Sequence, residues 1–102
     1  MSLLTEAVAQ EQRRIERMIE EYQSELEKLP KGALTTKTVK GNSYYYLQYR
    51  DGKKSVSKYV GKDSGRLQEL QLKLDRRRHV LVMLKALKQE YALSQKMMEA
   101  GI

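Results

Sequence analysis

Apolar residues recur at helical spacing along the first part of the chain. They return every three, four or seven positions, the period of one helix face, at Leu4, Val8, Ile15, Met18, Ile19, Tyr22, Leu26 and Leu29. Glutamate, glutamine and arginine fill most of the positions between them, and Ser2 or Thr5 can cap the start. Pro30 disfavours the helical conformation in the residue before it. The pattern therefore predicts a helix over residues 3–29.

After residue 32 the pattern changes to short runs that are rich in β-branched and aromatic residues. Two turn signals, Gly41-Asn42 and Asp51-Gly52, divide this stretch into runs at residues 33–40, 44–50 and 53–60. Because connections this short join neighbouring antiparallel strands, we predict a three-stranded antiparallel meander over residues 33–60.

A second helical pattern runs from residue 64 to residue 98, with Asp63 or Ser64 as its cap. Its apolar stripe is formed by Leu67, Leu70, Leu74, Leu81, Leu84, Tyr91 and Met98, and is widened by Val80, Met83 and Leu87. We therefore expect one α+β domain over residues 1–102, with the two helices packed as an antiparallel, coiled-coil-like pair. Two helices make a thin core, and the second has too wide an apolar face for one partner, so we expect a dimer. Whether the helices pair within one chain or between two stays open.

Side-chain alternation divides the predicted sheet into two faces, because successive residues of a strand point to opposite sides. Two-residue loops at both turn signals would place Leu47 opposite Val56, and Thr36 opposite Leu47. The face expected to pack on the helices then holds Leu34, Thr36, Thr38, Tyr45, Leu47, Tyr49, Lys54, Val56 and Lys58. The face expected to meet solvent holds Thr35, Lys37, Val39, Tyr44, Tyr46, Gln48, Arg50, Lys53, Ser55, Ser57 and Tyr59.

Charge is concentrated in the predicted sheet. The formal net charge is +7; residues 1–30 contribute −3, residues 31–66 contribute +7 and residues 67–102 contribute +3. A basic element of this kind attracts phosphate backbones or acidic protein surfaces. The chain has no cysteine and one histidine, which excludes disulfides, thiolate metal sites and multi-histidine sites. No apolar run approaches the roughly 18–20 residues of a membrane span, and no signal-peptide pattern is visible, so we expect a cytoplasmic protein.

Tyrosines and cations share the solvent face of the predicted sheet, and this combination suggests nucleic-acid binding. Lysine and arginine neutralise phosphates, and tyrosine rings can stack on bases or donate hydrogen bonds to phosphate oxygens. A β-ribbon can also enter the DNA major groove. The residues expected to make contact are Tyr44, Tyr46, Arg50, Lys53 and Tyr59, with Lys37 and Lys58 as supporting cations. Two other interpretations remain open: an acidic protein partner, and a sheet that is merely stabilised by its tyrosines and lysines.

The same segment carries a resemblance to a known family. Its matching positions are Gly41, Tyr44, Tyr45, Tyr46, Tyr49, Arg50, Gly52, Lys53, Tyr59, Val60, Gly61 and Lys62. They resemble a segment near the N-terminus of many insertion-sequence transposases and a similar segment in small proteins of bacterial mobile elements. Those transposases carry a catalytic domain with acidic metal ligands, for which this chain has no room. The resemblance therefore implies an accessory module that binds nucleic acid without catalysis. We favour DNA over RNA as its ligand and leave the choice between them open.

The remaining polar clusters are expected to be structural. Arg76-Arg77-Arg78 is expected to pair with glutamates of the first helix, and His79 to be a partly buried structural residue. The glutamates of the first helix lie on its solvated side and form no acid–base pair. We therefore predict no enzyme activity, no metal site and no cofactor. The alternative function is a coiled-coil interaction or assembly module in which the hairpin only joins and caps the helices.

Overall fold

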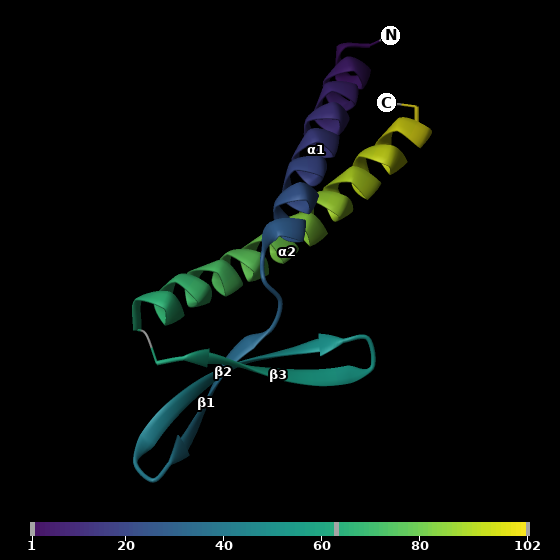
Figure 1. The fold of residues 1–102 in the computed structure, drawn as a ribbon. Helices are drawn as coiled ribbons and strands as arrows, with labels where there is room; N and C mark the ends of the chain where they lie inside the picture. The colour runs from purple at the N-terminus through teal and green to yellow at the C-terminus, as the bar shows by residue number, and fades with distance from the viewer. Residues whose placement is uncertain (1, 63, 102) are drawn as a thin grey trace. The chain divides into compact units, whose positions relative to one another are not determined.

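The computed structural model describes residues 2–62 and 64–101, and it confirms the predicted α+β order of helix, three-stranded antiparallel sheet and helix (Figure 1). The elements are α1 (Leu3–Lys28), β1 (Ala33–Val39), β2 (Asn42–Asp51), β3 (Lys54–Gly61) and α2 (Ser64–Glu99). The oxygen of the Ser2 side chain accepts a hydrogen bond from the Thr5 amide at 3.1 Å, so Ser2 is the cap of α1. Asp63 and the side chain of Ser64, the two predicted caps of α2, lie outside the described residues.

The chain forms two compact units, and α2 contributes to both. The first, which we call the helical unit, consists of residues up to 28 and residues from 79 onward; the second, the sheet unit, comprises residues 29–78. Among the described residues, no helix is long and apolar enough to cross a membrane.

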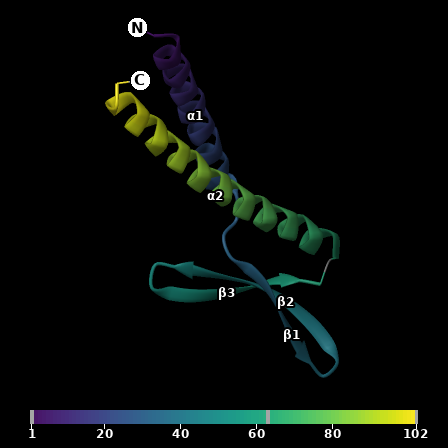
Figure 2. The same cartoon turned by 180° about the vertical axis from the view of Figure 1, so that it is seen from behind.

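In the helical unit, α1 and the last part of α2 run antiparallel, and both views show the start of α1 and the end of α2 at the same end of the pair (Figures 1 and 2). The buried apolar side chains are Val8, Ile15, Val80, Leu84 and Leu87. The Tyr91 hydroxyl links the two helices by donating a hydrogen bond to the Glu16 carboxylate at 2.7 Å.

Two predictions for α2 are wrong, and one buried residue in it was not expected. Leu81 is 44% exposed although it belongs to the predicted stripe, and His79 is exposed rather than partly buried. Ser94 is buried instead, and its hydroxyl is satisfied by donating to the Tyr91 carbonyl at 2.6 Å. The buried face of this part of α2 is that of Val80, Leu84 and Leu87, at spacings of four and three residues, and Leu81 points about 100° away from Val80.

In the sheet unit, β2 lies between β1 and β3, and the two hairpins diverge from it (Figure 1). Both predicted registers are wrong by two residues. Leu34 pairs with Leu47 across the first hairpin, and Tyr49 pairs with Val56 across the second. The first turn uses Lys40-Gly41 with φ of 51° and 80°, as a type I′ turn requires; the second begins at Gly52 with φ of 62°, which suits type II′.

Each predicted register is in error by an even number of residues, so the strand residues still point to the faces predicted for them. The exception is Lys53, which belongs to the turn rather than to a face. A β-bulge also interrupts the second pairing: Tyr46 lies opposite Tyr59 and Tyr45 opposite Gly61, so that Val60 is the extra residue.

The entry to β1 depends on the missing side chain of Gly32. Its φ is +112°, a conformation that residues with a side chain rarely adopt. A Cβ at this position would lie 2.2 Å from the Gln48 carbonyl oxygen of β2. Glycine at this position therefore lets the backbone pass close beside the middle strand.

Candidate nucleic-acid interface

Three tyrosine rings gather on the solvent face of the sheet. Tyr44 and Tyr46 stand two residues apart on β2, and Tyr59 comes from β3 directly opposite Tyr46. The Tyr46 and Tyr59 ring centroids are 5.6 Å apart with an interplanar angle of 62°, and those of Tyr44 and Tyr59 are 6.4 Å apart at 51°. These are edge-to-face and tilted contacts of the kind that aromatic rings prefer. We call the three residues the tyrosine cluster.

Two lysines lie beside the tyrosine cluster, one in the first strand of the sheet and one directly after the last strand. The Lys37 ammonium of β1 lies 5.2 Å from the Tyr46 ring centroid, and the Lys62 ammonium, just after β3, lies 4.7 Å from that of Tyr44. Both distances fall within the range of cation–π attraction. The structure therefore combines two cations with three aromatic rings on one surface.

The predicted contact residues Arg50 and Lys53 lie away from this cluster. Arg50 is on the same face but pairs with Ser55, next to the end of the second hairpin, and Lys53 is in the turn itself. Arg50 stands four residues beyond Tyr46 along β2, which corresponds to roughly 13 Å of strand. Both residues are exposed. They can contact only a different part of an extended ligand from the part at the cluster.

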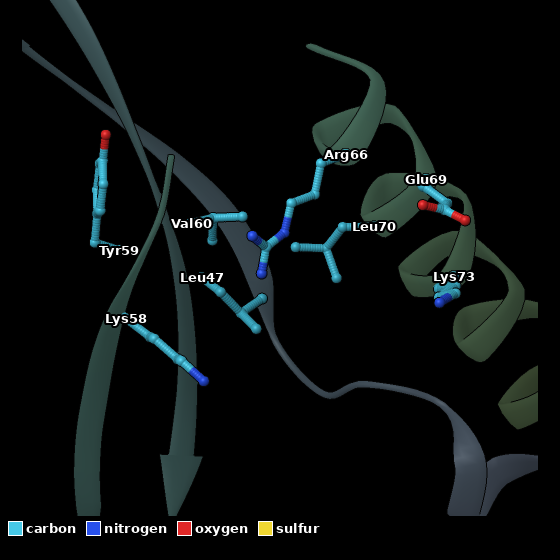
Figure 3. A pocket seen from close by; sticks show the side chains of 8 residues that line it. All are labelled: Leu47, Lys58, Tyr59, Val60, Arg66, Glu69, Leu70 and Lys73. Carbon is cyan, nitrogen blue, oxygen red and sulfur yellow. The ribbon is translucent and has the colours of Figure 1, made fainter. Parts of the chain in front are cut away.

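Lys58 lies on the opposite face of the sheet, as alternation predicts. It is opposite Leu47 and lines a cavity of about 250 Å³ between the sheet and the first turns of α2. In Figure 3 the side chains of Leu47 and Val60 are directed toward Leu70 and Arg66 of α2, while Tyr59 lies on the far side of the strands. The sheet therefore does not bring Lys58 to the tyrosine cluster.

Lys62 is the member of the interface that the sequence analysis left out of its contact residues. Lys62 is the last residue of the Tyr-Val-Gly-Lys segment that resembles the transposase family. This position in the segment could have indicated that Lys62 belongs to the interface. Simple alternation fails there because the bulge at Val60 shifts the side chains that follow it. Sequence reasoning has no means to locate such a bulge from a single chain.

The difference in net charge between the two units is larger than the difference between any two of the segments 1–30, 31–66 and 67–102. The sheet unit holds thirteen of the twenty cations and four of the thirteen acids, a formal charge of +9, which leaves −2 for the helical unit. Arg78 of the basic run forms an ion pair with Asp75 of its own helix at 3.7 Å. Among the described residues, no three acidic or histidine side chains are grouped so as to hold a metal ion.

Three groups of the helical unit, Glu11, Arg14 and Tyr91, have shifted pKa values. A hydrogen bond from the Arg14 guanidinium to the Glu11 carboxylate, at 3.0 Å, lowers the pKa of Glu11 and raises that of Arg14. The pKa of Tyr91 is raised, first by its hydrogen bond to Glu16 and then by desolvation. The Glu11–Arg14 pair lies within one turn of α1, and the Tyr91–Glu16 hydrogen bond joins α1 to α2.

Comparison with known proteins gives one family. The family model of a domain of unknown function, DUF6788, matches residues 8–69, more than half of the chain, so the chain belongs to this family. The matched stretch runs from Val8 in α1 through the whole sheet to Glu69 in α2, and it contains the tyrosine cluster and both flanking lysines. Neither the curated proteins nor the solved structures gave a match.

Proposed function

We propose that this member of the DUF6788 family is a small non-catalytic protein that binds nucleic acid through the solvent face of its sheet. The observation that carries the proposal is the tyrosine cluster with Lys37 and Lys62 beside it. Lysines can neutralise backbone phosphates while tyrosine rings stack on bases, a combination found in proteins that bind nucleic acids. The +9 charge of the sheet unit adds long-range attraction for such a polyanion.

The choice of DNA over RNA, and a role beside mobile genetic elements, depend on the resemblance of residues 41–62 to transposase N-terminal segments. That resemblance covers the residues of the tyrosine cluster themselves, together with Arg50, Lys53 and Lys62. These residues are also the ones that could meet a ligand on the solvent face and at the end of the second hairpin. The proposal is therefore of an accessory DNA-binding module.

A titration tests the proposal directly. Fluorescein-labelled DNA, as duplex and as single strand, is titrated with the protein at about 50 and 200 mM salt, and binding is followed by anisotropy. Binding should weaken steeply as the salt concentration rises, because released counterions drive contact with phosphates. The double change Arg50→Glu and Lys53→Glu should weaken it further without unfolding the protein. Absence of binding at the low salt concentration would end the proposal.

The helical unit supports a second role, that of an assembly module formed by two copies of the chain. A groove of about 240 Å³ between α1 and α2 is lined by Ala7, Val8, Glu11, Ile15, Glu90, Leu93, Ser94 and Met97. Leu93 and Val82, both in the helical unit, are 53% and 65% exposed. A pair of helices has one apolar side left open, and a second pair can cover it in a four-helix arrangement. We propose a homodimer formed through this side, with the coiled-coil-like packing between helices completed by the second copy.

A further inference from the structure

The three rings of the tyrosine cluster are not equally accessible to a ligand. Tyr44 and Tyr46 are half-buried, and each has a lysine ammonium over its ring, from Lys62 and Lys37 respectively. Tyr59 is 52% exposed, and neither of its aromatic neighbours lies parallel to it, since the interplanar angles are 51° and 62°. Tyr59 therefore displays the ring on which another planar group can stack.

The requirement of an exposed base face for stacking distinguishes single-stranded from double-stranded nucleic acid. In a duplex each base is covered on both faces by its neighbours, so a protein reaches only base edges and phosphates. A side chain that stacks by its ring face needs a base that has left its neighbours, which single strands supply readily. Proteins that recognise sequence in the major groove present polar side chains to base edges, whereas the centre of the solvent face of this sheet is aromatic.

We infer that the interface binds single-stranded nucleic acid, with one unstacked base against Tyr59 and the adjoining phosphates at Lys37 and Lys62. This inference rests on the proposed function and narrows it to one class of ligand. The ammonium groups sit on flexible stems, so each can leave a tyrosine ring for a phosphate oxygen without moving the strands. Because the two lysines flank the cluster from β1 and from the end of β3, a strand crossing Tyr59 passes close to both.

The first measurement compares ligands. A single-stranded DNA of about twelve nucleotides, within the roughly 4–16 nucleotides that single-strand-binding domains occupy, is compared with the duplex of the same sequence and with the RNA single strand. We expect the DNA single strand to bind at least about tenfold more tightly than the duplex, and the RNA arm identifies which sugar is accepted. Equal or tighter binding to the duplex would overturn the inference and leave the proposed function standing. Binding to none of the ligands would overturn both.

The second measurement tests the stacking residue. Tyr59→Leu keeps an apolar side chain against the cluster but removes the ring, whereas Tyr59→Phe keeps the ring. We expect the leucine variant to bind the single strand roughly 5- to 150-fold more weakly, and the phenylalanine variant to bind as the unaltered chain does. Unchanged affinity in Tyr59→Leu, or an equal loss in both variants, would overturn the stacking role.

A spectroscopic signal on the unaltered chain keeps the test valid if Tyr59→Leu does not fold. The chain has seven tyrosines and no tryptophan, so its emission comes from tyrosine. A base stacked on Tyr59 should quench part of that emission, and the quenching should be smaller in Tyr59→Phe, which lacks the stacked emitter. Identical quenching in the two proteins would place the base elsewhere and overturn the inference.

Discussion

The helical unit and the sheet unit differ in both charge and packing. The helical unit has a charge of −2 and buries an apolar seam between two helices, while the sheet unit has a charge of +9 and displays an aromatic and cationic face. A charge of +9 in fifty residues opposes compactness through self-repulsion, which an element shaped for stability alone would avoid. This contrast supports the two proposals, that the sheet unit binds a ligand and that the helical unit pairs with a second copy.

The largest expected effect comes from reversing charge in one unit at a time. Lys37→Glu with Lys62→Glu should weaken binding to single-stranded DNA about 100-fold or more, because two cationic contacts become repulsive. Lys85→Glu with Lys88→Glu changes the net charge equally at exposed positions of the helical unit, and should alter affinity by less than about threefold.

Anisotropy measures both double variants, and circular dichroism verifies their folding. Removal of the two lysines should also reduce the slope of log K against log salt by roughly 0.7 per lysine. Equal losses in the two double variants would mean that net charge alone drives binding, and would remove the assignment of the site to the sheet unit.

The next effect concerns the stability of the sheet unit. Gly32→Ala should lower its free energy of unfolding by about 3 kcal/mol, because the new Cβ adds a clash with the Gln48 carbonyl to an unfavourable positive φ. Gly52→Ala is the matched control; its φ is also positive but nothing lies within 4 Å, so the loss should be about 1 kcal/mol.

Hydrogen exchange resolves the two units for these glycine variants. Amide protection should fall in β1 to β3 and stay unchanged in α1. A uniform loss of protection along the chain would show that the two units unfold together. Similar losses in the two variants would show that the approach of Gly32 to Gln48 contributes little.

A smaller effect tests the second role of the helical unit. Leu93→Glu places a charge in the apolar groove and should weaken the proposed dimer by about tenfold or more, since burial of an unpaired charge is costly. Leu72→Glu changes a leucine of the sheet unit that is 69% exposed, and should leave the dimer intact. Light scattering over a range of protein concentrations reports the mass. A monomer at every concentration for the unaltered chain would dismiss the dimer.

The smallest effect is a pH dependence within the helical unit. The raised pKa of Tyr91 means that the folded state holds the phenolic proton more tightly than the unfolded state. The hydrogen bond to Glu16 therefore contributes stability below the ordinary tyrosine pKa of about 10, and this contribution is lost as the pH rises through the raised folded value. Melting temperatures of the unaltered chain and Tyr91→Phe should differ slightly near neutral pH and converge in strong alkali. A difference that does not change with pH would contradict this account.

Much of the fold follows from local patterns. The helix bounds, the three strands and their order are within a few residues of the predictions, because apolar period and turn residues act over short distances. The faces of the sheet were predictable even though both registers were wrong, since a shift of two residues preserves alternation. The tyrosine cluster and Lys37 could thus be assigned to one face from the sequence.

Other features depend on contacts that no local pattern contains. The bulge at Val60, the position of Lys62 over Tyr44, and the separation of Arg50 from the cluster follow from how β3 pairs with β2. The close approach of Gly32 to Gln48 follows from the path of the backbone past the middle strand. In α2, the exposure of Leu81 and the burial of Ser94 follow from the direction in which α1 packs on the helix.

The sequence by itself determined the elements, their order, the concentration of cations in the sheet and the set of side chains on each face, because these depend on residue type and on periods of two and of about 3.6 residues. Only the tertiary structure decided that three of the seven tyrosines touch, that two lysines cover two of those rings, and that Tyr59 is left exposed. The physical reason is that ring contact requires register and twist accurate to a few ångströms, which cross-strand packing sets and the sequence pattern does not.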